Sequence, residues 1–76
     1  MPRYHFDIRE NDGIAWDEEG LDLPDLQAAE IEAAQSLADM ARDLPPNAPR
    51  RSVAIEVRSN GRPLFKAALV YELARH

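Results

Sequence analysis

The fold of this chain is decided by residues 53–73, which read VAIEVRSNGRPLFKAALVYEL. Apolar residues alternate on both sides of the turn Ser59-Asn60-Gly61, a pattern typical of a β-hairpin. We expect a three-residue loop here, with Ile55 opposite Phe65. A two-residue loop would shift the pairing by one residue and turn half of the apolar side chains toward solvent. The apolar pattern therefore favours the longer loop.

A second hairpin is predicted near the N-terminus around Asn11-Asp12-Gly13. Its strands would run over residues 3–10 and 14–18, where apolar residues again alternate with polar ones. With all three turn residues in the loop, Ile8 would lie opposite Trp16. Both side chains would then belong to the apolar face of the sheet.

The segment between the hairpins has helical periodicity from residue 25 to residue 44. Asp25 follows a proline and suits the N-cap, where its carboxylate can accept hydrogen bonds from free backbone N–H groups. Pro45-Pro46 would end the helix. Ile31 and Ala38 lie off the main apolar stripe and form a second small patch. The main stripe consists of Leu26, Ala29, Ala33, Leu37, Met40 and Leu44.

These elements predict a single α+β domain over residues 1–76, with a two-layer ββαββ architecture. Its four-stranded antiparallel sheet would carry the long helix on one face. The favoured strand order is 2-1-3-4, which keeps every neighbouring pair antiparallel and allows a right-handed crossover through the helix. The order 2-1-4-3 stays open. The four expected strands are residues 3–10, 14–18, 52–58 and 62–73.

The last predicted strand is apolar on both faces, and this indicates an interface. Leu64, Ala68 and Val70 would point away from the helix, although one helix cannot cover both faces of a sheet. Strands of this kind are normally covered on both sides. We therefore expect a homodimer, or a protein partner, at this surface. The candidate interface residues are Leu64, Ala68, Val70, Ile31 and Ala38.

Composition narrows the class of protein further. The chain has 76 residues and no cysteine, which excludes disulfides and thiolate zinc sites. It shows no signal-peptide pattern and no membrane-spanning stretch, so a cytoplasmic location is expected. Residues 1–49 carry 3 basic and 12 acidic side chains, net −9, and residues 50–76 carry 6 and 2, net +4, giving the total of −5. This acidity argues against nucleic-acid binding. We expect the basic side chains of the second half to pair with the acidic half.

No residue pattern predicts a catalytic, cofactor or metal site. The acidic residues around Asp17-Glu18-Glu19 have the oxygen ligands that a hard cation needs, but not the spacing of a calcium loop. A solvated acidic link that caps the helix is the simpler interpretation. His5 should lie on the solvent side beside Asp7, and His76 is at the C-terminus. Neither has the partners of a ligand or a nucleophile.

Pro2 supports an enzymatic alternative. Removal of Met1 would leave a prolyl amine, the general base of tautomerases, which also have small β-α-β subunits. Such a site needs arginines to hold an acidic substrate. Arg9, Arg50 and Arg51 are candidates by residue type alone.

A resemblance to a known family lies in four segments: Met1–Ile8, Asp17–Gly20, Leu23–Ala29 and Val57–Pro63. They resemble a family of small proteins from alphaproteobacteria, mainly rhizobia and their relatives, that is classed as a domain of unknown function. This resemblance covers nearly the whole chain and implies a stand-alone bacterial domain without catalytic residues to carry over. The element order is more loosely similar to antitoxins of the HicB type, at the level of fold only.

The sequence thus favours a non-enzymatic dimerising or partner-binding protein. The alternatives are a tautomerase-like enzyme that uses Pro2 and an accessory protein that binds a toxin or a nucleic acid. The last rests on the basic side chains of residues 50–76.

Overall fold

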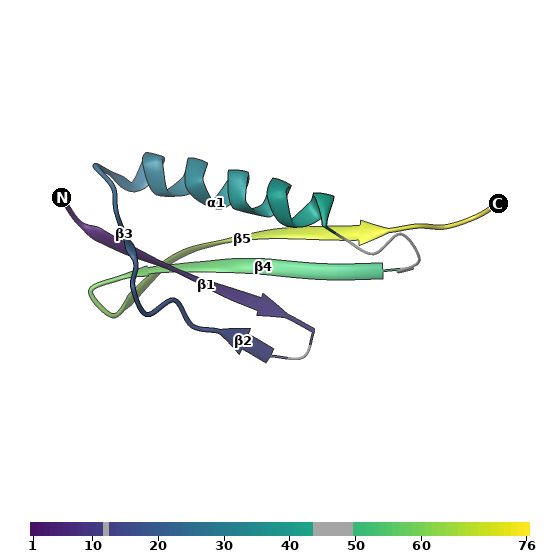
Figure 1. Cartoon of the computed structure of the whole chain (residues 1–76), viewed down its shortest axis with the longest axis horizontal. Coiled ribbons are helices and arrows are strands. Elements are labelled where there is room, and N and C mark those ends of the chain that lie inside the picture. Colours follow the sequence, from purple (N-terminus) through teal and green to yellow (C-terminus); the bar gives the residue numbers. More distant parts are fainter. Residues whose placement is uncertain (12, 44–49) are drawn as a thin grey trace.

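The computed structural model describes residues 1–11, 13–43 and 50–76. The chain forms an antiparallel sheet with one helix lying along one of its faces (Figure 1). This is the α+β class that the sequence predicts. The elements in chain order are β1 (Arg3–Glu10), β2 (Gly13–Ala15), β3 (Leu21–Asp22), α1 (Leu26–Arg42), β4 (Arg50–Ser59) and β5 (Arg62–Glu72).

The sheet has five strands rather than the four predicted. Four of them lie in the order β2-β1-β4-β5, and the additional strand β3 pairs with β1 off this path. The predicted order is therefore incomplete. The alternative that places β5 beside β1 is wrong, because β4 occupies that position. β3 escaped prediction because it is only two residues long and follows an acidic link without apolar alternation.

The register of the first hairpin differs from the prediction. Ile8 pairs with Ala15, and Glu10 pairs with Gly13, so only residues 11 and 12 lie between the paired ends. Residue 12 itself is outside the described residues. The one-residue shift moves Trp16 off the face covered by α1. Trp16 is instead 62% exposed on the opposite face.

The register of the second hairpin is also corrected. Its loop has two residues, Asn60 with φ 54° and Gly61 with φ 74°, the pair of positive angles that a type I′ turn requires. A bulge follows, where the register shifts between Val57 and Arg58. Val57 therefore pairs with Phe65, and Ile55 with Ala67. The observed loop is one residue shorter than the predicted one, and the bulge adds one residue to the strand instead. The apolar residues of the hairpin therefore still share a face.

α1 begins where the sequence predicts a cap. The Asp25 carboxylate accepts a hydrogen bond from Ala28 N at 2.9 Å, and Asp43 forms the C-cap. The predicted end at Leu44 and the stop at Pro45-Pro46 lie outside the described residues.

The core lies between α1 and the sheet, where the helix packs on β4 and β5. Two helix alanines, Ala29 and Ala33, are fully buried and allow the helix to approach the sheet closely. Phe6, Ile8, Phe65 and Leu69 pack around this centre while partly exposed. The buried apolar core residues are Tyr4, Ala29, Ala33, Leu37, Val53, Ile55 and Val57.

Candidate functional site: the open face of the sheet

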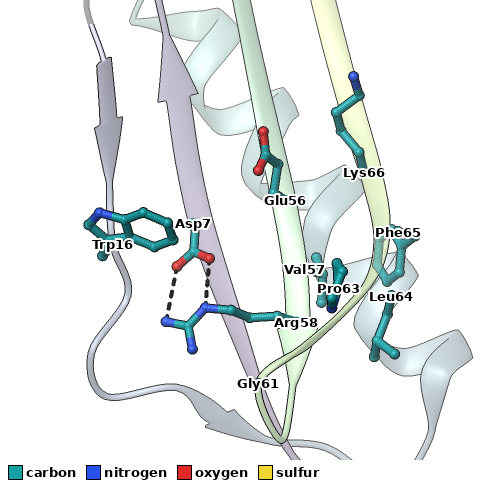
Figure 2. A pocket seen from close by; sticks show the side chains of 10 residues that line it. All are labelled: Asp7, Trp16, Glu56, Val57, Arg58, Gly61, Pro63, Leu64, Phe65 and Lys66. Atoms are coloured by element: carbon teal, nitrogen blue, oxygen red, sulfur yellow. Dashed lines mark hydrogen bonds and ion pairs between the residues drawn. The ribbon is translucent and has the colours of Figure 1, made fainter.

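The face of the sheet turned away from α1 carries the residues that could act on another molecule. We call it the open face. Side chains alternate across each strand, so the neighbours of the core residues in β1, β4 and β5 point to this side. Its members come from β1, β4, β5 and the segment after β2, and Figure 2 shows six of them: Asp7, Trp16, Glu56, Arg58, Leu64 and Lys66. Ala68 and Val70 of β5 complete the face.

Asp7 is the buried polar residue at the centre of this region, with 2% of its surface exposed. Arg58 Nε donates to Asp7 Oδ2 at 2.8 Å, and Arg58 Nη2 lies 3.4 Å from Asp7 Oδ1 (Figure 2). The backbone N–H of Asp17 also donates to Asp7 Oδ1, at 2.9 Å. The hydrogen bond to Asp7 raises the pKa of the Arg58 guanidinium above its ordinary value. The prediction that Asp7 lies in solvent beside His5 is therefore wrong.

Trp16 closes the open face over this ion pair. The Arg58 guanidinium carbon lies 5.9 Å from the centroid of the Trp16 ring, within the range of a cation–π interaction. The indole therefore shields one side of the Arg58–Asp7 pair, while most of its own surface stays exposed.

Asp17 fixes the link between β2 and β3 through all of its polar groups. Its carboxylate accepts hydrogen bonds from the backbone N–H of Phe6 at 3.0 Å, Gly20 at 3.1 Å and Glu19 at 3.2 Å. Burial raises the pKa of Asp17, but these three donors together lower it below the ordinary value. The Asp17 carbonyl accepts from Arg58 Nη2 at 3.1 Å.

His5 belongs to the same network. Its Nδ1 lies 2.8 Å from the Asp17 carbonyl oxygen, and because a carbonyl only accepts, that ring nitrogen carries the proton. His5 thus holds the link in place rather than forming a solvated pair with Asp7.

The acidic residues between Asp17 and Asp25 make structural contacts within the chain. Asp22 accepts from Arg3 Nε at 3.0 Å and from Arg3 Nη2 at 3.2 Å, and Asp25 caps α1. The hydrogen bond from Arg3 lowers the pKa of Asp22. Across the described parts of the chain, no group of three or more histidine, aspartate or glutamate side chains is placed to hold a metal ion.

A shallow groove of about 430 Å³ runs over the open face beside the second hairpin (Figure 2). Trp16 and the Asp7–Arg58 pair form one side, and Leu64 and Lys66 form the other. Across the groove Glu56 pairs with Lys66 in register and also forms an ion pair with Arg9. The hydrogen bond from Arg9 lowers the pKa of Glu56. The charges that line the groove are therefore largely matched within the chain.

The structure separates the predicted interface residues into two groups. Leu64, Ala68 and Val70 lie together on β5, with Leu64 44% and Val70 56% exposed. Ile31 is 52% exposed, and it lies with the exposed Ala38 on the outer side of α1. That side is opposite the buried stripe that contacts the sheet. The two groups cannot form one continuous patch.

Pro2 and the arginines proposed for an acidic substrate are not brought together. The backbone carbonyl of Pro2 accepts a hydrogen bond from Leu23 N at 3.1 Å and extends the pairing of β1 with β3. Arg9 lies at the far end of β1. Arg50 and Arg51 begin β4, whose other end pairs with the start of β1.

Basic side chains of the second half partly pair as predicted. Arg58 pairs with Asp7 of the first half, as predicted. Arg9 of the first half pairs with Glu56 of the second, which is the reverse of the prediction, and Arg50 pairs with Glu72 in its own half at 3.8 Å. These pairs interrupt the basic surface that a nucleic acid would need.

A family model described as a domain of unknown function (DUF6894) matches residues 3–70, which is most of the chain. No curated protein and no solved structure matches. The match confirms the predicted family class, while the alphaproteobacterial group and the likeness to HicB antitoxins stay predictions. Among the described residues, no helix is long and apolar enough to cross a membrane.

Proposed function

The chain belongs to the family described as a domain of unknown function (DUF6894), and we propose that it is a non-enzymatic dimerising module. The partner is a second copy of the same chain. It is bound by β5 and the adjoining part of the open face.

One observation carries this proposal: the exposed apolar side chains of β5. Leu64, Ala68 and Val70 are all exposed on the same strand, and Trp16 extends the apolar surface across the groove. A monomer that keeps such a strand exposed is prone to non-specific association. Covering the strand with a copy of itself is the commonest closed solution.

The polar groups of the open face support a structural role rather than a catalytic one. Asp7, Asp17 and Arg58 are engaged with one another and with backbone groups. In the described part of the chain, every buried side-chain nitrogen and oxygen has a hydrogen-bond partner. A catalytic acid or base needs a free position at which substrate can meet it. The carboxylates of Asp7 and Asp17 leave little room for a substrate to reach them.

The proposal is tested by the mass of the protein in solution. Light scattering coupled to size-exclusion chromatography should give the mass of two chains for the wild type at micromolar concentration. Val70→Lys and Leu64→Lys introduce a charge into the surface and should give one chain. Ile31→Lys is the matched control, because Ile31 is similarly exposed but lies on the outer side of α1. It should remain dimeric.

Two results would contradict the proposal. A wild-type protein that stays monomeric up to about 1 mM would exclude a dimer of useful affinity. Equal loss of the dimer in Ile31→Lys and Val70→Lys would place the contact on α1 or show that the added lysines act through folding. Circular dichroism of each variant separates those two causes.

A further inference from the structure

The free edge of β5 offers backbone groups to a further strand. β5 pairs with β4 on one side, and the described part of the chain places no strand on its other side. Backbone N–H and C=O groups point outward along such an edge and can bond to another extended strand. The side chains of β5 determine which strand fits there and in which register.

A bulge divides β5 into an irregular and a regular part. The register with β4 shifts between Val57 and Arg58, next to the second turn. From Phe65 to Glu72 every residue of β5 pairs with β4 in regular order, and this part contains no proline. Its side chains therefore alternate strictly between the two faces. Those on the open face are Lys66, Ala68, Val70 and Glu72.

Lys66 and Glu72 place opposite charges near the two ends of this regular part, on the same face. Among the ion pairs of the described residues none includes Lys66, and Glu72 pairs with Arg50 at 3.8 Å. We infer that residues 66–72 of two copies pair antiparallel about a twofold axis at Leu69, with Lys66 of each copy opposite Glu72 of the other. This geometry rests on the dimerising function proposed above and specifies its contact.

The register at Leu69 creates a row of alternating charges across both sheets. Within one chain Arg50 lies directly opposite Glu72, and Glu56 lies directly opposite Lys66. Joining the copies at Leu69 therefore gives the order Arg50, Glu72, Lys66, Glu56 over four adjacent strands, two from each copy. Directly opposed residues of opposite charge stabilise a sheet. The row occurs twice, once on either side of the axis.

The same register covers exposed apolar side chains at the C-terminal end of β5. On the open face Val70, which is 56% exposed, lies opposite the small Ala68 of the other copy. Directly after the strand Leu73, which is 53% exposed, comes opposite Phe65 on the face that carries α1. Cross-strand apolar pairs of this kind add to the stability of the shared ladder.

Other antiparallel registers leave the charges without partners. An axis at Lys66 opposes two lysines, and an axis at Ala67 sets Lys66 against Ala68. An axis at Ala68 sets Lys66 against Val70, and an axis at Val70 sets Glu72 against Ala68. The register at Leu69 is the one that pairs Lys66 with Glu72.

The helix layer is compatible with this arrangement. A twofold axis perpendicular to the sheet keeps both helices on one face. α1 packs on β4 and β5, so its copy lies two strand spacings away, roughly 10 Å. That is an ordinary distance between packed helices.

Exchange of the two charges tests the register. Lys66→Glu and Glu72→Lys each create two like-charge contacts across the axis, so each variant alone should dimerise about tenfold more weakly than the wild type. Mixing the two variants restores both opposite-charge contacts. The mixture should return to wild-type affinity and form mainly the mixed dimer, as measured by native mass spectrometry with one chain labelled with ¹⁵N. Recovery in the mixture also shows that both variants fold.

The matched control is Arg62→Glu. It makes the same change of charge on the same strand, but Arg62 pairs with Ser59 beside the turn, beyond the bulge and outside residues 66–72. This variant should dimerise like the wild type. Weakening as large as that of Lys66→Glu would show that the contact includes the irregular part of β5 and would overturn the register.

Cross-linking tests the register without a change of charge, and the chain has no cysteine of its own. Residues 68 and 70 of opposite copies are directly opposed, which places their Cα atoms about 4.5–5.5 Å apart, within the range of a disulfide. A mixture of Ala68→Cys and Val70→Cys chains should therefore form a mixed disulfide under oxidising conditions. A disulfide between two Ala68→Cys chains would place the axis at Ala68 and overturn the inference.

The outcomes separate this inference from the proposed function. If the mixture of Lys66→Glu and Glu72→Lys dimerises no better than either variant while Val70→Lys still abolishes the dimer, the register is wrong but the dimerising function stands. If the wild type is monomeric throughout, both fail.

Discussion

The two long sides of the sheet end in different ways. On one side, β2 and β3 pair with opposite ends of β1, and the Asp17 carboxylate binds Phe6 N in the gap between them. On the other side, β5 runs for 11 residues, and the described part of the chain places no strand beyond it. The first edge is closed by short strands and side chains, and the second is long and apolar. The sheet is therefore protected from further strand pairing at the first edge, whereas β5 at the second edge is suited to pair with another chain.

The closed edge depends most on Asp7. Asp7→Ala would leave Arg58 and Asp17 N without their acceptor beneath Trp16. We expect a loss of about 3 kcal/mol in the free energy of unfolding, measured by urea denaturation. The loss arises because removing one member of a buried ion pair leaves the other charge uncompensated. Asp39→Ala, which removes an exposed ion pair with Arg42, should change stability by less than about 0.5 kcal/mol. Equal losses of stability in Asp7→Ala and Asp39→Ala would mean that the Asp7–Arg58 pair is not shielded from solvent.

Asp17 should have the next largest effect. Asp17→Asn keeps only one of the two oxygens that serve Phe6, Glu19 and Gly20, so we expect a loss of about 1–2 kcal/mol. Glu18→Gln, one residue away and exposed, should be nearly neutral.

The Asp17 variant also has a pH signature. A lowered folded-state pKa means that the carboxylate adds stability above its unfolded pKa of about 3.9, and that this contribution is lost as pH falls through the folded value. The difference between wild type and Asp17→Asn should therefore be full at pH 7 and shrink below about pH 4. A difference that grows on acidification would contradict this role.

Two glycines with similar backbone angles test the packing of the link between β2 and β3, with smaller expected losses of stability. Gly20 has φ +76°, and an added Cβ would lie 2.8 Å from Arg3 Cγ, whereas at Gly61, with φ +74°, nothing lies within 4 Å. Gly61→Ala should lose about 1 kcal/mol from the left-handed backbone alone. Gly20→Ala should lose more, because the side chains of Arg3 and His5 must shift. Thermal denaturation of both variants measures the difference, and equal losses would show that the link is loosely packed.

The sequence predicts the layers well and the registers poorly, for physical reasons. Alternation and helical periodicity identify both hairpins, α1 and its Asp25 cap, since each depends on neighbours in sequence. The register of the second hairpin depends on a bulge after its turn, and alternation cannot distinguish a bulge from a longer loop. The register of the first hairpin depends on whether Gly13 belongs to the loop or to the strand, and the turn residues alone do not decide this.

The candidate site illustrates the same limit. Leu64, Ala68 and Val70 could be predicted to point away from the helix, because their strand carries apolar residues on both faces. The burial of Asp7 could not, because it depends on Trp16 and on a link whose acidic residues suggested solvation. The signal lay in Asp17 itself, an Asx residue three positions before a glycine, which is typical of a turn held by its own carboxylate.

The most direct test of the contrast between the two edges is amide hydrogen exchange at two protein concentrations, resolved by residue with NMR. The Phe6 amide should be protected equally at about 10 μM and 1 mM, because Asp17 accepts its hydrogen bond within one chain. The amides of β5 that do not bond to β4 should become protected only at the higher concentration, as a second copy pairs with them. Exchange of those β5 amides at one rate at both concentrations would contradict the account.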